Sequence, residues 1–156
     1  MRGELGDVSQ YSSGELSLDL GEMYLEFLED KEKIRELFSF LADTGEGCVL
    51  FHCSAGKDRT GVMALLLMML AGADKQDCMT NYGQSYTNLC RQEKFARAFE
   101  QELPQEAGKL RFSDPETIAP CYDKIMEEFG GIRPYLRACG LEEGQITSVY
   151  EKLVKE

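Results

Sequence analysis

One stretch of the sequence, Cys48-Val49-Leu50-Phe51-His52-Cys53-Ser54-Ala55-Gly56-Lys57-Asp58-Arg59-Thr60-Gly61, leads from a short apolar run through a loop into a longer apolar run. Residues 48–52 follow a glycine and are mostly apolar, which predicts a short, fully buried strand. From Thr60 to Leu70 the chain is apolar all round, which predicts a central buried helix that Gly72 closes. The loop 53–59 is therefore expected to join the end of a strand to the start of a helix.

This loop has the arrangement that aims several backbone N–H groups at one point. The first turn of a helix leaves its amides unpaired, and the helix dipole favours an anion there. The same positive end lowers the pKa of a cysteine, so Cys53 is expected to form a thiolate near neutral pH. A thiolate at the base of such a cradle can attack phosphorus in line, and Arg59 can hold two phosphoryl oxygens.

The spacing from Cys53 to Arg59 gains its specificity from the surrounding residues. A cysteine six positions before an arginine is common by chance, but none of the other five cysteines has an arginine at that offset. The alternative interpretation is an ordinary strand-to-helix turn that carries a buried cysteine. A nucleotide-binding P-loop is excluded, because the pattern GxxxxGK[ST] does not occur.

The segment HCSAGKDRTG, residues 52–61, resembles the signature loop of the protein tyrosine phosphatase superfamily. Its Lys57-Asp58 pair is similar to the branch of bacterial and fungal tyrosine and dual-specificity phosphatases. The likeness extends to MYLEFLEDKEKIRELFSFLAD (23–43), LLLMMLAGA (65–73) and EEFGGIRPYLRACGLEEGQI (127–146). It covers the chain from about residue 20 to its end.

The resemblance implies a role for each residue of the loop. Cys53 would be the nucleophile that forms a phosphocysteine intermediate, Arg59 would bind the phosphoryl group, and Asp58 would transfer a proton to the leaving group. The backbone of residues 54–59 would form the anion cradle. The expected phosphate-binding residues are Ser54, Ala55, Gly56, Lys57, Asp58 and Arg59.

Three neighbours are expected to support this chemistry. The Thr60 hydroxyl can donate to the Cys53 sulfur and stabilise it as a leaving group. His52 would face away from Cys53 in a strand, which favours a role in bracing the loop over one in tuning the thiol. In similar enzymes the positive charge of Lys57 goes with acceptance of phosphoinositides as well as phosphoproteins.

The resemblance also implies the fold: α/β, cysteine-phosphatase-like and helix-rich, with a short central parallel sheet that looks incomplete within this chain. Family members are longer, and their N-terminal part supplies most of the sheet. Residues 1–156 are expected to form one domain, with 1–21 loosely ordered. Besides the central helix, apolar spacing and capping signals predict helices near 22–42, 74–88, 91–102, 113–129, 132–138 and 142–155.

The identity of the general acid stays open beyond Asp58. The branch usually has Asp-Tyr after the central helix, whereas this chain has Asn81-Tyr82, so an acid is lost at that position. Asp7 and Asp19 are further carboxylates that only their positions recommend.

Composition limits the partners and the location. The formal net charge is −11, so the surface repels nucleic acid and anionic lipid, and phosphate chemistry needs a local positive site.

The longest apolar run, Val62 to Ala73, is shorter than the roughly 20 residues that span a bilayer. No signal peptide is recognisable, which predicts a cytoplasmic protein with reduced thiols. The six cysteines and single histidine predict no metal site and no cofactor, with Cys48 in the core.

Three hypotheses follow. The first is a metal-independent phosphomonoester hydrolase that acts on phosphotyrosine, with phosphoserine, phosphothreonine or phosphoinositides as further substrates and phosphate or sulfate expected in the loop. The second is a truncated, non-catalytic phosphate-binding module that needs a partner to complete its sheet. The third keeps the activity but requires a homodimer, because a strand with an unpaired edge favours pairing with another chain.

Overall fold

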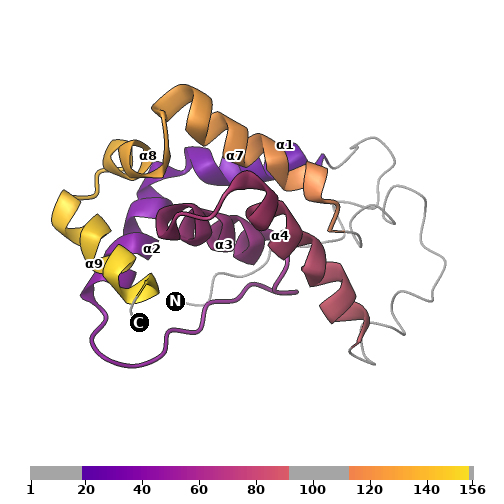
Figure 1. Cartoon of the computed structure of the whole chain (residues 1–156), viewed down its shortest axis with the longest axis horizontal. Coiled ribbons are helices and arrows are strands. Elements are labelled where there is room, and N and C mark those ends of the chain that lie inside the picture. The colour runs from indigo at the N-terminus through magenta and orange to yellow at the C-terminus, as the bar shows by residue number, and fades with distance from the viewer. Residues whose placement is uncertain (1–18, 92–112, 155–156) are drawn as a thin grey trace.

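The computed structural model describes residues 19–91 and 113–154, and the regular structure in both ranges is helical (Figure 1). The described helices are α1 (Leu20–Glu29), α2 (Lys31–Asp43), α3 (Asp58–Ala71), α4 (Lys75–Cys90), α7 (Pro115–Phe129), α8 (Ile132–Ala138) and α9 (Glu143–Leu153). Residues 1–18, with most of the expected N-terminal segment, lie outside the description. So do residues 92–112, with most of the helix expected at 91–102.

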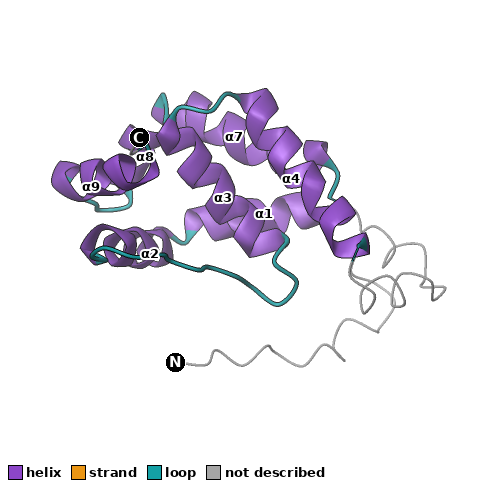
Figure 2. Cartoon of the chain, turned by 60° about the horizontal axis from the view of Figure 1, so that its bottom comes forward, coloured by secondary structure: helices purple, strands orange, loops and turns teal. Residues whose placement is uncertain are grey.

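Helix α3 lies at the centre of the molecule and contacts α1, α4, α7, α8 and α9 (Figures 1 and 2). Its sequence has no charged residue after Arg59, so every face can be buried. The helix ends at Gly72, whose left-handed backbone (φ 95°) lets its N–H reach the carbonyls of Met68 and Met69. The buried central helix predicted from the sequence is confirmed.

The helix expected over 22–42 is two helices, separated at Asp30. The Asp30 carboxylate accepts a hydrogen bond from the Lys33 amide at 3.1 Å and so begins α2. The apolar spacing continues across the break, with Leu28 buried in α1 and Ile34 and Phe38 in α2, and it gave no sign of the division.

The capping signal at residues 113–116 correctly predicts the start of α7, although Asp114 rather than Ser113 is the capping residue. Its carboxylate accepts from the Glu116 amide at 3.0 Å. The helix ends at Gly130 in the left-handed region (φ 74°), as the sequence indicates. Helices α4, α8 and α9 also form within two residues of their expected bounds.

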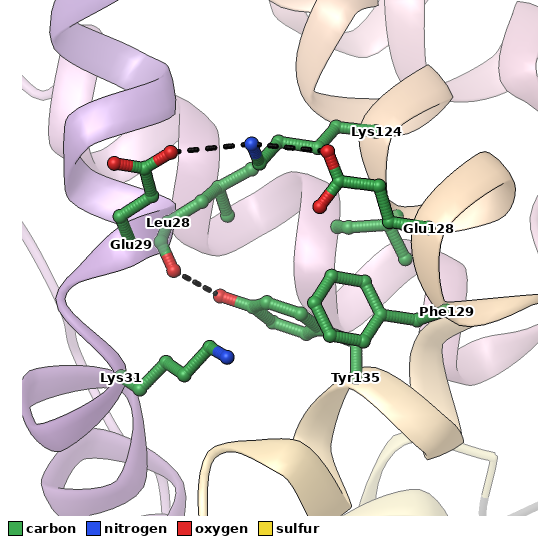
Figure 3. A pocket seen from close by; sticks show the side chains of 8 residues that line it. Leu28, Glu29, Lys31, Lys124, Glu128, Phe129 and Tyr135 are labelled. Atoms are coloured by element: carbon green, nitrogen blue, oxygen red, sulfur yellow. Dashed lines mark hydrogen bonds and ion pairs between the residues drawn. The ribbon is translucent and has the colours of Figure 1, made fainter.

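Polar contacts, one of them buried, tie the end of α1 to α7 and α8 (Figure 3). The Tyr135 hydroxyl of α8 donates to the Leu28 carbonyl of α1 at 2.9 Å. Above it, the Lys124 ammonium of α7 lies 3.2 Å from carboxylate oxygens of both Glu29 and Glu128. These contacts fix α1 against the rest of the bundle.

The strand expected over residues 48–52 is not formed. Residues 44–57 are a loop that runs along one side of the helices (Figure 2), and no strand occurs in the described ranges. Leu50 is 84% exposed, and Cys48, expected in the core, is exposed as well. A lone extended segment has no partner for its backbone groups, so apolar composition alone does not make it a strand. The expected parallel sheet is thus absent from the described residues.

None of the described helices combines the length and the apolar character that crossing a bilayer requires.

Candidate active site

The predicted loop lies between the exposed segment 44–52 and the first turn of α3, at the N-terminal end of the central helix. Helix α3 begins at Asp58, and no side chain caps its first amides. Gly56 turns the loop with φ +68°, a conformation that a residue with Cβ rarely adopts. The open amides and the positive end of the helix dipole make this a suitable place for an anion.

The Cys53 thiol lies where these amides converge. Its partial burial raises the pKa, but hydrogen bonds from the Thr60 hydroxyl and from the Thr60, Lys57 and Gly56 amides lower it to about 7. Thr60 Oγ1 is buried and pairs with no oxygen or nitrogen of the described residues, which leaves the Cys53 sulfur as the acceptor for its proton.

Other cysteines behave in the opposite way. Burial raises the pKa of Cys78 to about 11 and that of Cys121 to about 12, and it raises the pKa of Cys139 as well. Among these thiols only Cys53 has its pKa lowered, because it meets backbone N–H groups rather than apolar side chains. Of these four cysteines, Cys53 is thus the one whose surroundings favour a thiolate.

A cavity of about 320 Å³ opens beside Cys53. Apolar side chains from α1, α2, the loop and α3 line it together with a ring of polar groups. The lining residues are Phe27, Lys33, Glu36, Leu37, Phe51, His52, Cys53, Arg59, Thr60 and Met63. The cavity therefore brings the thiol, a guanidinium and an apolar wall to one place.

Arg59 is exposed at the rim of this cavity. Within the described ranges no carboxylate forms an ion pair with it, so its N–H donors are open. His52 also lines the cavity, and its Nδ1 lies 3.1 Å from the Cys53 carbonyl oxygen. That contact is the kind by which a side chain braces the loop.

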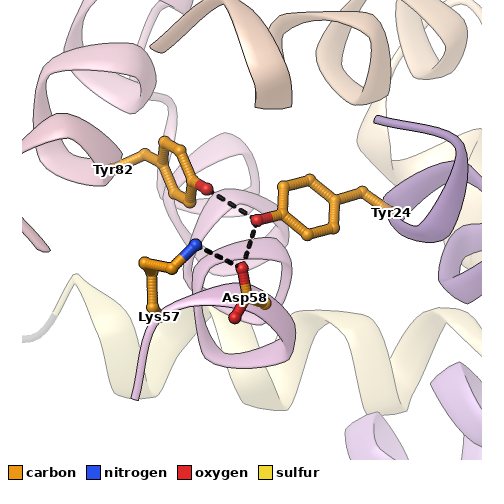
Figure 4. A network of polar contacts seen from close by, with 4 residues as sticks. All are labelled: Tyr24, Lys57, Asp58 and Tyr82. Atoms are coloured by element: carbon orange, nitrogen blue, oxygen red, sulfur yellow. Dashed lines mark hydrogen bonds and ion pairs between the residues drawn. The ribbon is translucent and has the colours of Figure 1, made fainter. Parts of the chain in front are cut away.

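Lys57 and Asp58 form a polar network on another side of the loop (Figure 4). The Lys57 side chain is buried, and its ammonium donates to Asp58 Oδ1 at 2.5 Å. The same oxygen accepts a hydrogen bond from the Tyr24 hydroxyl at 2.5 Å, and the Tyr82 hydroxyl lies 2.6 Å from that of Tyr24. Asp58 does not line the cavity beside Cys53, although 28% of its side chain stays exposed.

Of the remaining predicted residues, three lie in the loop, one caps α1 and one lies outside the described residues. Ser54 and Gly56 are exposed and Ala55 is half-buried on the turn that follows Cys53. Asp19 caps α1 by accepting from the Gly21 amide at 2.8 Å, and it does not line the cavity. Asp7 lies outside the described residues.

Sequence reasoning missed the two tyrosines. Tyr24 comes from α1 and Tyr82 from α4, and 58 positions separate them in the chain. Each occupies an ordinary apolar position of its helix, so nothing marks its hydroxyl as part of a site. The one available signal was the Asn81-Tyr82 pair, at the place where the resemblance predicts Asp-Tyr.

Comparison with known proteins decides the family. The sequence profile of the tyrosine phosphatase family matches residues 5–155, which is nearly the whole chain. The chain belongs to the tyrosine phosphatase family. Within this family, it is 33% identical over 144 residues to a tyrosine-protein phosphatase of Nostoc commune, a match that covers 86% of this chain and 49% of the relative.

Two other family members are similar. A triple specificity protein phosphatase of Mycobacterium tuberculosis is 28% identical over 159 residues, covering 92% of this chain and 58% of its own length. A putative tyrosine-protein phosphatase of Cupriavidus necator is 46% identical over 55 residues, which cover 34% of this chain and 20% of that protein. The chain spans about half the length of the first two tyrosine phosphatase relatives.

Proposed function

We propose that this tyrosine phosphatase family chain carries the catalytic loop of a cysteine-dependent phosphomonoester hydrolase that works without a metal. The observation that carries the proposal is the Cys53 thiol, whose pKa converging amides lower to about 7 beside the open Arg59 guanidinium. A nucleophile and an anion cradle at one point are what transfer of a phosphoryl group to sulfur requires.

The reaction would run in two displacements. The Cys53 thiolate attacks phosphorus, an S–P bond forms, and the P–O bond to the leaving group breaks. The leaving oxygen takes a proton, for which Asp58 is the proposed donor. Water then attacks the phosphocysteine, giving a proton back to Asp58, and inorganic phosphate leaves as the thiolate is restored. Arg59 would hold two of the phosphoryl oxygens throughout.

Phosphotyrosine is the substrate class that the cavity favours. Phe27, Leu37, Phe51 and Met63 give the 320 Å³ space an apolar wall that suits a phenyl ring. Phosphoinositides would need free cations at the rim, but the Lys57 ammonium is turned inward toward Asp58. Lys33 is likewise paired with Asp30 at 2.9 Å. Phosphoserine, phosphothreonine and phosphoinositides are therefore secondary substrates in this proposal.

A substrate panel tests the proposal directly. A phosphotyrosine peptide, a phosphoserine peptide and a phosphoinositide would be given to the wild-type chain, to Cys53→Ser and to Cys48→Ser. We expect turnover of the phosphotyrosine peptide that Cys53→Ser abolishes and Cys48→Ser, an exposed cysteine outside the loop, leaves unchanged. Vanadate binding without any turnover would contradict the enzyme and leave a phosphate-binding module.

We also propose that a second copy of this chain covers the exposed loop. The backbone of residues 45–52 makes no backbone hydrogen bond to other described residues, and Leu50 and Phe51 are exposed. An extended segment in this state is suited to pairing with the same segment of another copy around a two-fold axis. Such pairing would place two loops side by side.

A further inference from the structure

A buried tyrosine, Tyr24, donates to one oxygen of the Asp58 carboxylate, and a second buried tyrosine, Tyr82, contacts the Tyr24 hydroxyl. Tyr24 and Tyr82 are each 2% exposed, and their rings pack edge to face with centroids 6.0 Å apart. Figure 4 shows the Tyr24 hydroxyl of α1 pointing at Asp58, the Tyr82 hydroxyl of α4 pointing at that of Tyr24, and Lys57 on the other side of the carboxylate. A carboxylate at the start of α3 is thus connected to two other helices by a chain of two hydrogen bonds.

The direction of the hydrogen bonds follows from the donors available. The Lys57 ammonium can only donate, and the single Tyr24 proton goes to Asp58 Oδ1. Tyr82 must therefore donate to the Tyr24 oxygen. Burial, together with the bond to Asp58, raises the pKa of Tyr24, and burial raises the pKa of Tyr82 to about 12, so both keep their protons near neutral pH.

This arrangement makes the two carboxylate oxygens unequal. Oδ1 receives both donors, so a proton carried by Asp58 must reside on Oδ2. The Asp58 side chain stays 28% exposed, so the carboxylate is not sealed from solvent. The network therefore determines both the orientation of the carboxylate and the oxygen that acts.

Packing holds the network in place. A Cβ added at Gly61 would lie 2.8 Å from Cδ2 and 2.9 Å from Cε2 of Tyr82, closer than real Cβ contacts allow. The Tyr82 ring thus rests against the backbone of the first turn of α3, one turn from Asp58. This close approach gives the glycine of the Thr60-Gly61 pair a function in the site that the anion cradle alone does not require.

We propose that Tyr24 and Tyr82 are positioning residues, which orient Asp58 so that its free oxygen protonates the leaving group. The proposal rests on the function proposed above and deepens it. A proton donor matters most when the leaving group is a weak acid, such as a phenol with a pKa of about 10. A more acidic nitrophenol leaves without help. Loss of the tyrosine hydroxyls should therefore affect the two leaving groups differently.

The test compares phenyl phosphate with 4-nitrophenyl phosphate for the wild-type chain, Tyr24→Phe, Tyr82→Phe and Tyr135→Phe. Tyr135 is the matched control, because its buried hydroxyl bonds the Leu28 carbonyl and the Cys139 side chain and takes no part in the Asp58 network. We expect Tyr24→Phe to lower kcat on phenyl phosphate by about tenfold and kcat on 4-nitrophenyl phosphate by less than about threefold. Tyr82→Phe, one bond further away, should show the same selectivity to a smaller extent.

A melting temperature for each variant separates positioning from a purely structural role. If Tyr24→Phe and Tyr82→Phe lower both rates equally, or only lower the melting temperature as Tyr135→Phe does, the positioning role is wrong. The selectivity is a ratio within one variant, so partial unfolding cannot imitate it. A wild-type chain with no hydrolysis that depends on Cys53 would overturn the proposed function, and the role of both tyrosines with it.

Discussion

At the scale of single residues, Cys53 differs from its fellow cysteines because backbone N–H groups surround its sulfur. Hydrogen bonds from the Thr60 hydroxyl and from these amides lower its pKa to about 7, whereas burial raises the pKa of Cys121 to about 12. The chain carries a net charge of −11, so the site that stabilises this thiolate is local and does not come from the overall field.

This contrast predicts how the thiols react with iodoacetamide. Only the thiolate is alkylated, so the rate at Cys53 should rise with pH and level off above a midpoint of about 7. Cys121 should stay unreactive through that range, because its thiol is protonated and buried. Peptide mapping after timed labelling measures both rates. A Cys53 midpoint near that of a free cysteine would show that the amides do not converge as described.

Arg59 supports a second prediction. Its guanidinium can bind two phosphoryl oxygens at once, whereas a lysine offers one point charge. Arg59→Lys should therefore lower kcat/KM by roughly 10²-fold or more. Arg35→Lys, the same exchange at an α2 arginine that does not line the cavity, serves as the control and should change kcat/KM little. Equal losses in both variants would contradict a specific phosphoryl contact at Arg59.

The sequence alone led to the residues proposed for the loop but not to the contacts that organise them. Cys53 and Arg59 were predictable because spacing, glycines and the apolar helix all point to one anion site. The contacts among Tyr24, Asp58 and Lys57 were not predictable, because they join α1 to the loop and no local sequence pattern spans that interval. Asp58 was expected to face the leaving group. In the structure, hydrogen bonds from Tyr24 and Lys57 to its Oδ1 also hold the carboxylate.

At the scale of elements, local chemistry explains most of the helices. Helix α3 was predictable from an apolar run closed by Gly72, and α7 from the capping signal before it. The break between α1 and α2 at Asp30 was not predictable, because this capping residue lies within a continuous apolar stripe. The prediction of a strand at 48–52 was wrong, because a strand depends on a neighbouring strand, which a short apolar run cannot specify.

Gly61 gives a prediction at this scale. Gly61→Ala would place a methyl group against the buried Tyr82 ring, which its hydroxyl bond to Tyr24 prevents from moving freely. We expect a loss of about 1–3 kcal/mol in the free energy of unfolding. The control is Gly144→Ala at an exposed position of α9, where the new Cβ meets nothing within 4 Å. Its free energy of unfolding should stay unchanged or rise by up to about 1 kcal/mol. Urea unfolding measures both, and equal stability of the two variants would exclude the clash.

At the scale of the whole molecule, the helices form a bundle around α3, and one side of it carries a loop without a sheet. Beside that loop is a groove of about 790 Å³ with an apolar floor from Leu41, Leu67 and Val149. The exposed Leu50 and Phe51 lie in the same segment. An apolar groove next to unpaired backbone is what the proposed second copy would cover.

Light scattering tests this assembly. We expect a mass above that of one chain for the wild type and the mass of one chain for Leu50→Lys, because a charge at the 84% exposed Leu50 opposes apolar pairing. Met126→Lys, the same kind of exchange at an exposed apolar residue of α7 that does not line the groove, should leave the mass unchanged. A wild type that stays at the mass of one chain over a wide concentration range would rule out the second copy.

The most direct test of the central claim is to trap the covalent intermediate. The chain would be mixed with a phosphotyrosine peptide, quenched in acid within the first turnover and digested for mass spectrometry. We predict one phosphoryl group on Cys53, absent from Cys53→Ser and abolished by vanadate. Turnover with phosphate on another residue, or with no adduct at all, would contradict nucleophilic attack by the Cys53 thiolate.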